Sequence, residues 1–236
     1  MQTLVTAAQA LGFRLTPEQA RLFQIYSDEL VDWNRRLSLT TIVDPQDIQV
    51  KHFLDSLTCL SALPAGFRCS TVLDVGSGAG FPGLPIKIYD PSLQVTLLES
   101  VAKKAAFLEH VVTALGLTGV TVVTDRAEAL GQNPDHRQRY DLVAARAVAD
   151  LAVLAEYCLP FCRVGGYFVA QKKWGIDAEL HNATGAVATL GGGPARQVAV
   201  HLPGLEQRQL IVVEKVRPTP PRYPRRPGLP AKRPLV

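Results

Sequence analysis

Cysteine is scarce in this chain of 236 residues, and the few cysteines do not form a motif. Cys59, Cys69, Cys158 and Cys162 lack C-x-x-C spacing and lie within apolar stretches, which favours buried thiols over disulfides or a zinc site. Cys158 and Cys162 stand one helical turn apart, but no histidine lies near them in sequence to complete a metal site. We therefore expect no metal.

Long apolar runs are absent as well. No run reaches the length needed to cross a membrane, and the first residues lack the charged-then-apolar pattern of a secretory leader. The chain is 47% hydrophobic and 19% charged, enough to bury one substantial core with an added helical segment. We therefore expect a cytoplasmic monomer that does not bind membranes.

Acidic residues are missing from residues 215–236, which hold seven basic residues and seven prolines. The net charge of +4 therefore comes from this tail, and the chain before it is net negative. Prolines at this density predict an extended segment. Its charge predicts a phosphate-binding arm in which Arg225 and Arg226 contact RNA, with Tyr223 free to stack on a base or to pack the arm down. A solvated tail that only aids solubility is the alternative.

Helical patterns come first in the chain. We expect helices at 4–10 and at 17–37, behind the capping sequence TPEQ, and a third that begins at Pro45 after Asp44. From residue 70 onward, short Val/Leu-rich runs alternate with helical patterns, which predicts a parallel sheet covered on both faces. The predicted strands are 71–75, 94–98, 120–124, 141–145 and 167–171, and the clearest helices between them are 102–115 and 151–158.

Two final strands, near 197–201 and 209–216, have no helical pattern between them, so an antiparallel edge hairpin is expected. The prediction is thus an α/β protein in three parts. They are an N-terminal helical extension (1–62), a sheet-containing core (63–216) and a basic proline-rich tail (217–236).

The segment 71–83, TVLDVGSGAGFPG, joins the first strand to a helix through glycines spaced to wrap a small ligand. Gly78, Gly80 and Gly83 match the dinucleotide pattern G-x-G-x-x-G. Gly76, Gly78 and Gly80 match the tighter G-x-G-x-G of Rossmann-like methyltransferases. A strand-to-helix turn with no ligand is a third reading. The glycines alone do not choose among these.

Charge favours the methyltransferase pattern. A carboxylate at Asp74 would repel a pyrophosphate but suits S-adenosylmethionine, which carries an ammonium and a sulfonium, and Pro82 removes one amide from an anion cradle. Glu99 follows the second strand, twenty-five residues after Asp74, where a carboxylate can accept from both ribose hydroxyls. Alternatively, Glu99 caps the helix that begins near Ala102. A nicotinamide-dependent oxidoreductase remains the competing enzyme class.

Ligands of open parallel sheets bind beyond the carboxyl ends of the strands. Arg146 ends a strand of alanines and valines, where a charge needs a partner, so a site role is favoured over simple solvation. The charged residues expected at this edge of the sheet are Asp74, Glu99, Arg126, Arg146 and Lys172.

Several segments together resemble one family over nearly the whole chain. They are KHFLDS at 51–56, LDVGSGAGFPG at 73–83, Arg126-Ala127-Glu128, Arg146-Ala147 and YPRRPG at 223–228. The family is RsmG, also called glucose-inhibited division protein B. The resemblance implies a Rossmann-like class I methyltransferase fold with S-adenosylmethionine as cofactor. It also implies methylation of ring nitrogen 7 of one guanine in 16S ribosomal RNA of the small subunit.

The resemblance also implies roles for individual residues. Two positions depart from the family pattern: Ser38 stands where N-L-T usually begins, and Lys173 follows Lys172 where glycine is usual. The implied cofactor contacts are Gly76, Phe81, Ala127, Glu128 and Arg146, with Glu99 on the ribose. The implied RNA- or guanine-positioning residues are Arg126, Arg146, Lys172 and Arg208.

Such chemistry requires little from the side chains. Guanine nitrogen 7 has an in-plane lone pair and no proton to lose, so alignment with the methyl group matters more than a general base. The sequence lacks the [DN]-P-P-[YF] motif of amine methylation and the Pro-Cys nucleophile of carbon methylation. We therefore assign Arg146 and Lys172 the catalytic role of positioning the base.

Two other interpretations stay open. His52, Asp55 and Ser56 suggest a hydrolase triad, but they share one predicted helix and fit a buried structural hydrogen-bond cluster better. A non-catalytic ribosome-binding module would use the basic tail and carry a decayed pocket.

Overall fold

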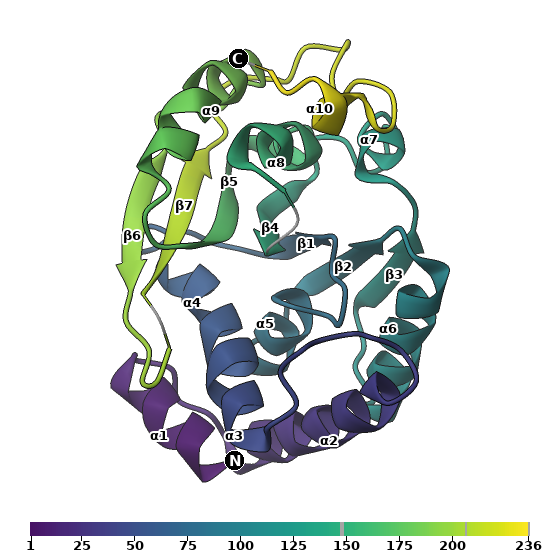
Figure 1. Ribbon diagram of the computed structural model, residues 1–236, viewed down its shortest axis with the longest axis vertical. Coiled ribbons are helices and arrows are strands. Elements are labelled where there is room, and N and C mark those ends of the chain that lie inside the picture. The colour runs from purple at the N-terminus through teal and green to yellow at the C-terminus, as the bar shows by residue number, and fades with distance from the viewer. Residues whose placement is uncertain (147–148, 206, 236) are drawn as a thin grey trace.

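The computed structural model describes residues 1–146, 149–205 and 207–235, and within them a seven-stranded sheet forms the centre of the fold (Figure 1). The strand order is β3-β2-β1-β4-β5-β7-β6. The first five strands run parallel, and β7 pairs antiparallel with both β5 and β6. The strands are β1 (Thr71–Val75), β2 (Gln94–Glu99), β3 (Val120–Thr124), β4 (Tyr140–Arg146), β5 (Cys162–Lys173), β6 (Arg196–Val200) and β7 (Arg208–Glu214).

The predicted parallel sheet with an antiparallel edge hairpin is therefore confirmed. Ala147 of the sequence motif and Val236 of the tail lie outside the described residues. The strand order reverses between β1 and β4, because β2 and β3 lie on one side of β1 while β4 and β5 lie on the other. Such a switch point opens a crevice beyond the carboxyl ends of the strands, where ligands of this architecture bind.

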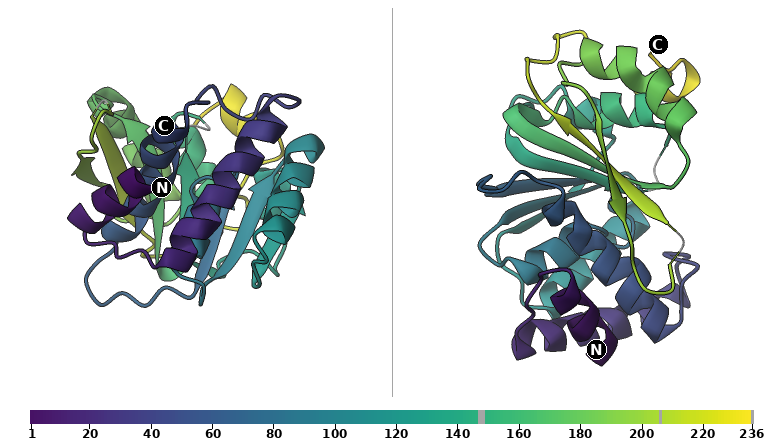
Figure 2. Two further views of the ribbon diagram at one scale, coloured as in Figure 1. Left: turned by 90° about the horizontal axis from the view of Figure 1, so that it is seen from below. Right: turned by 90° about the vertical axis from the view of Figure 1, so that its left-hand side faces the viewer.

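Helices cover both faces of the sheet (Figure 2). The buried side chains of β1 alternate between two cores. Val72 packs into the core shared with the N-terminal helices. Leu73 and Val75 pack into the core beneath two later helices, α8 (Leu151–Cys158) and α9 (Asp177–Thr189). The helices that follow β1 are α5 (Gly83–Tyr89), α6 (Ala102–Ala114), α7 (Ala127–Leu130), α8 (Leu151–Cys158), α9 (Asp177–Thr189) and α10 (Leu229–Lys232).

The predicted N-terminal helices are present, and they share a core with the sheet. The second helix begins after Thr16, whose side chain accepts from the amide of Gln19 while the Gln19 side chain accepts from the amide of Thr16. It ends at Asn34, earlier than the predicted end at Leu37. The helical segments are α1 (Gln2–Ala10), α2 (Pro17–Asn34), α3 (Pro45–Ile48), the π-helix η1 (Gln49–Leu54) and α4 (Asp55–Ser61).

Three of the four cysteines are buried and the fourth, Cys69, is half buried, in keeping with core thiols. No helix in the described parts of the chain is both long and apolar enough to span a bilayer.

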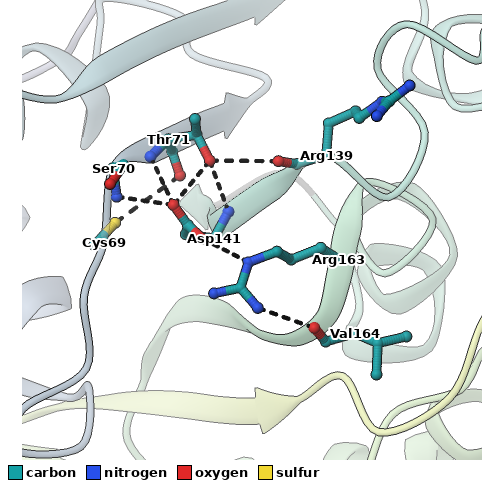
Figure 3. Close-up of polar contacts among 7 residues, drawn as sticks. All are labelled: Cys69, Ser70, Thr71, Arg139, Asp141, Arg163 and Val164. Carbon is teal, nitrogen blue, oxygen red and sulfur yellow. Dashed lines mark hydrogen bonds and ion pairs between the residues drawn. The ribbon is translucent and has the colours of Figure 1, made fainter.

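A polar cluster joins the amino-terminal ends of the central strands (Figure 3). The crevice lies beyond the opposite, carboxyl ends of these strands. One oxygen of Asp141 accepts from the amides of Ser70 and Thr71, at 2.8 and 2.9 Å, and the other accepts from Arg163 Nε at 2.6 Å. Burial alone would raise the pKa of the Asp141 carboxyl, but these donors outweigh it and the pKa is lowered. The cluster therefore joins β1, β4 and β5 through one carboxylate.

The C-terminal tail is not the free extended arm that its prolines and charges predict. It folds back over α7 and α8 and contains α10 (Figure 1). Arg137 donates to the carbonyls of Thr219, Pro220 and Tyr223, and Tyr223 itself is buried. These contacts pack the tail onto the body, which is one of the two roles considered for Tyr223.

Candidate functional site

A cleft of about 1050 Å³ lies at the carboxyl ends of β1, β2, β4 and β5, where the strand order reverses. It is walled by the glycine loop after β1, the end of β2, the π-helix and the segment between α2 and α3. π-Helical turns are frequent at functional sites, and this one brings Lys51 and His52 to the cleft. Predicted residues that line the cleft are Gly76, Gly78, Phe81, Glu99, Arg146, Lys172 and Arg208.

The glycine loop needs glycine for its backbone shape. Gly76, Gly78 and Gly80 have φ angles of 72°, 58° and 94°, in the region that side chains disfavour. At Gly80 an added Cβ would also lie 2.5 Å from both the Tyr26 hydroxyl and Leu84 Cδ1. Gly76 and Gly78 present their backbone to the cleft, whereas Gly80 packs inward against α2 and α5.

The Asp74 carboxylate lies beneath the loop and does not line the cleft. It is 0% exposed, and one oxygen accepts from the amide of Gly83 at 2.9 Å, at the start of α5. The other oxygen has no partner among the described residues. Burial raises the pKa of this carboxyl to about 7, against the donors that lower it. Asp74 therefore shapes the loop from beneath, and Glu99 is the strand-end carboxylate that lines the cleft.

This buried carboxyl predicts a measurable pH dependence. Because the folded pKa of about 7 exceeds the ordinary value of 3.8, the folded protein retains a proton that the unfolded chain releases between these values. The stability that Asp74 contributes is therefore complete below pH 4 and is lost as the pH rises through 7. Relative to Asp74→Asn, the wild type should lose about 1.4 kcal/mol of unfolding free energy per pH unit across that window. Urea denaturation of both proteins at several pH values measures this, and parallel profiles would contradict it.

Glu99 closes the loop from the second strand. Its two oxygens accept from the amide of Gly78 at 2.9 Å and from the amide of Val101 at 2.8 Å. The carboxylate thus binds the amide of Val101, the residue just before α6, and also lines the cleft, while α6 itself has no side-chain cap. Each carboxylate oxygen has further lone pairs, so Glu99 can still accept from two hydroxyl groups of a ligand. The alternative that Glu99 serves as the helix cap is therefore not supported, and its place in the cleft leaves the ribose contact as a prediction.

Arg146 lies at the end of β4 over an aromatic stack. Its guanidinium carbon is 4.7 Å from the centre of the Phe81 ring, and the His52 ring stacks on Phe81 with ring centres 4.4 Å apart. The guanidinium also donates to the carbonyl of Lys51 at 3.2 Å and lies 3.6 Å from Asp55 Oδ2. Burial raises the pKa of the Asp55 carboxyl, and Arg146 counters it. The partner that the charge of Arg146 needs is therefore Asp55.

His52, Asp55 and Ser56 do not form a triad. The Ser56 hydroxyl donates to the backbone carbonyl of His52 at 2.6 Å, and the imidazole Nε2 lies 2.8 Å from Thr40 Oγ1. Burial, and then the charge of Arg146, lowers the pKa of His52 to about 3, so the ring is neutral at ordinary pH. The structural hydrogen-bond cluster is the correct interpretation.

Lys172 has a partner that the sequence did not reveal. Its ammonium donates to Glu179 Oε1 and to the carbonyl of Ala149, both at 2.6 Å. Glu179 comes from α9 and also accepts from the amide of Leu151 at 2.5 Å, so it joins the ends of β5 and α8. A glutamate on a helix without a motif gives no local signal, and only the tertiary fold identifies it.

Several predicted residues lie outside this cleft. Arg126 precedes α7 as its N-cap, and Ala127 begins that helix. The Glu128 carboxylate is buried and accepts from the amide of Gly228 at 2.8 Å. Arg225 is bound to the carboxylate of Glu156, whereas Arg226 is exposed.

The two departures from the family pattern both lie at the cleft. Ser38 and Lys173 line it. Asn34, at the end of α2, accepts from the amides of Leu39 and Thr40 at 2.8 and 3.0 Å, and donates to the carbonyl of Thr40. These bonds fix the segment after position 38 without a side-chain amide there.

Comparison with known proteins identifies the family. The family model described as GidB, rRNA small subunit methyltransferase G, matches residues 19–211. The chain belongs to this family. Curated relatives named ribosomal RNA small subunit methyltransferase G are 53% identical in Roseiflexus castenholzii and 50% identical in Dehalococcoides mccartyi, each over 100% of both chains. The resemblance predicted from the sequence is confirmed.

Solved structures support the fold. A methyltransferase from Pyrococcus furiosus matches with a TM-score of 0.55 at 11% identity, covering 82% of this chain and 98% of that one. TrmN from Thermus thermophilus matches with a TM-score of 0.53 at 16% identity, covering 71% of this chain and 53% of that one. The predicted class I methyltransferase fold is confirmed. Within the described residues, no cluster of three or more His, Cys, Asp or Glu side chains is arranged to hold a metal ion.

Proposed function

We propose that the protein transfers a methyl group from S-adenosylmethionine to ring nitrogen 7 of a guanine in 16S ribosomal RNA of the small ribosomal subunit. Membership of the rRNA small subunit methyltransferase G family supports the reaction class. The observation that carries the assignment to this cleft is the meeting of the glycine loop, Glu99, Arg146 and Lys172 at one strand-end crevice. Such a reaction belongs in the cytoplasm, where the small subunit is found.

The residues of the cleft fit the cofactor. The positive-φ glycines allow a ligand to lie against the backbone, and Glu99 offers free acceptor positions for ribose hydroxyls. The cleft volume of about 1050 Å³ exceeds what one cofactor fills and leaves room for a base. When bound, S-adenosylmethionine supplies a methyl group made electrophilic by its sulfonium. Ala127 and Glu128 remain proposed contacts at the neighbouring α7.

The carboxylates of the cleft support positioning rather than base catalysis. Glu99 accepts from two backbone amides, Asp55 lies beside Arg146, and Glu179 accepts from Lys172. Each of these acids is engaged, and nitrogen 7 of guanine has no proton to remove. The chain therefore holds the base in line with the methyl group and excludes water. Arg146 and Lys172 are the residues we assign to that positioning.

The charge of the cleft supports a nucleic-acid substrate. Basic side chains outnumber acidic ones in the lining, which suits phosphates and the electron-rich edge of guanine. The basic residues of the lining are Lys51, Lys104, Arg146, Lys172, Lys173 and Arg208. Arg126 and Arg226 are proposed RNA contacts outside it, whereas Arg225 is bound to Glu156.

The test combines a measurement of cofactor binding with mapping of the nucleotide that is methylated. Small subunits that lack the modification are incubated with radiolabelled S-adenosylmethionine and the protein, and the labelled nucleotide is mapped. We expect label at nitrogen 7 of one guanine, and calorimetry should show binding of S-adenosylmethionine but not of NAD. Binding of NAD without transfer would support an oxidoreductase. Binding of small subunits without cofactor binding would support a non-catalytic module.

A further inference from the structure

Three buried polar atoms that belong to residues of the cleft have no hydrogen-bond partner in the described parts of the chain. They are His52 Nδ1, Gln171 Oε1 and Arg208 Nε. Burying a polar group without a partner is costly, and such groups in native structures call for an explanation. All three residues line one cleft, so a polar ligand that enters it would supply missing partners. His52 is held in the aromatic stack on Phe81, which leaves Gln171 and Arg208 as the pair that can meet a substrate.

The hydrogen bond made by the side-chain nitrogen of Gln171 fixes the orientation of its amide group. The Nε2 atom donates to the backbone carbonyl of Asp55 at 2.7 Å. Since a carbonyl oxygen only accepts, the amide nitrogen must face Asp55 and the oxygen must face away from it. Gln171 is 6% exposed, so its oxygen is a buried acceptor set in the wall of the cleft.

Arg208 of β7 lies close to Gln171 of β5, the strand next to it in the sheet. Gln171 of β5 pairs directly with Leu210 of β7, and Arg208 lies two residues from Leu210. Side chains two apart on a strand share a face, so Gln171 and Arg208 emerge on the same side of the sheet as diagonal neighbours. The Nε–H of an arginine only donates. The pair thus offers one acceptor and one donor side by side.

We propose that Gln171 and Arg208 read the Watson–Crick edge of the guanine that is methylated. Gln171 Oε1 accepts from the N1–H and 2-amino groups, and Arg208 Nε–H donates to the carbonyl oxygen O6. This inference rests on the proposed function and adds the residues that select the base. Guanine carries its acceptor O6 beside its donor N1–H, whereas adenine carries a donor amine beside an acceptor nitrogen, so the same pair rejects adenine. Nitrogen 7 lies on the other edge of the base and stays free for the methyl group.

An unpaired base read in this way would supply the missing partners of both side chains. Enzymes that modify bases hold them out of the stack and recognise the Watson–Crick edge by hydrogen bonds. A site built to hydrogen-bond a substrate group discriminates strongly against an analogue that lacks it, because its buried polar atoms are then left unpaired. Gln171 and Arg208 are therefore specificity residues, distinct from the positioning roles of Arg146 and Lys172.

The experiment removes the 2-amino group from the substrate. Small subunits are assembled with either guanine or inosine at the target position, and kcat/KM for methyl transfer is measured on each. Inosine keeps N1–H and loses one hydrogen bond to Gln171, so we expect the wild type to prefer guanine by about threefold to tenfold. Gln171→Met should lower kcat/KM on guanine by a similar factor, bring the guanine-to-inosine ratio close to one, and leave the Kd for S-adenosylmethionine unchanged.

Gln209→Met is the matched control. Gln209 is a buried glutamine on the neighbouring strand, its Nε2 also donates to a backbone carbonyl, that of Lys173, and it does not line the cleft. This variant should keep the wild-type ratio of guanine to inosine. If Gln171 serves only to bind the backbone carbonyl of Asp55, Gln171→Met will lower kcat/KM on guanine and on inosine by the same factor. That result would show the proposal to be wrong.

The guanine-to-inosine ratio of kcat/KM for the wild type can be measured without any variant. It tests the base-reading role even if Gln171→Met does not fold. A wild-type ratio near one overturns the base-reading role while the proposed function stands. Absence of transfer to guanine-containing subunits would instead overturn the proposed function itself.

Discussion

Arg146→Ala is expected to lower the rate of methyl transfer by about a hundredfold to a thousandfold, because it removes the guanidinium that we propose positions the base. In the structure this side chain lies over Phe81 at the end of β4, fixed by the carbonyl of Lys51 and by Asp55. Single-turnover transfer from labelled S-adenosylmethionine to small subunits measures the rate. Calorimetry measures cofactor binding separately, so that a defect in the transfer step is distinguished from weakened cofactor binding.

The variant also has a structural cost that must be separated from the loss of activity. Arg146→Ala leaves the buried carboxyl of Asp55 without its nearby cation, and unfolding free energy should fall. The double variant Arg146→Ala with Asp55→Asn removes that unpaired charge, so it should recover stability but not activity. Recovery of transfer in the double variant would mean that Arg146 only neutralises Asp55.

Arg163→Ala serves as the matched control for losing an arginine from an ion pair. Arg163 pairs with Asp141 (Figure 3). Both residues lie near the starts of their strands, whereas the cleft lies at the opposite, carboxyl ends. This variant should lose stability and keep the wild-type rate of transfer per folded molecule.

Local signals in the sequence were sufficient to predict the strands of the sheet and the sharp bend of the glycine loop. Runs of valine and leucine predicted each of the central strands, because strands buried on both faces must be apolar throughout. Glycines at 76, 78 and 80 predicted a sharp bend, and all three have positive φ angles. Glu99 could be predicted to lie at the cleft because, in nucleotide-binding folds of this type, an acid that binds the ribose ends the second strand about twenty residues after the glycine loop.

Contacts between distant segments could not be predicted in this way. Glu179 and Gln171 show no motif, and their importance follows only from the carbonyls and cations that the fold brings beside them. Asp74 was expected to favour a cationic ligand by its charge, and the sequence did not reveal that its carboxyl is buried beneath the loop, where burial raises its pKa to about 7. A sequence shows which residues are charged, whereas burial decides which of them face a ligand.

The tail gives the second large prediction, and it concerns stability. Arg225 donates to both oxygens of Glu156, at 2.9 Å from Nε and 2.6 Å from Nη2, although the two residues are far apart in sequence. Glu156 is 0% exposed. Arg225→Met would leave this carboxylate buried without a counter-charge, which is expected to cost about 3 to 5 kcal/mol of unfolding free energy. Urea denaturation measures the loss.

Arg226→Met provides the control, since Arg226 is the exposed neighbour in the same segment. Its unfolding free energy should stay within about 0.5 kcal/mol of the wild type. The two variants also separate the two roles considered for the tail. If Arg225 were chiefly a phosphate contact, Arg225→Met would weaken RNA binding and flatten its salt dependence while leaving stability intact. The bond to Glu156 favours the opposite result, in which stability falls and the salt slope is kept, because that guanidinium is already held by a carboxylate.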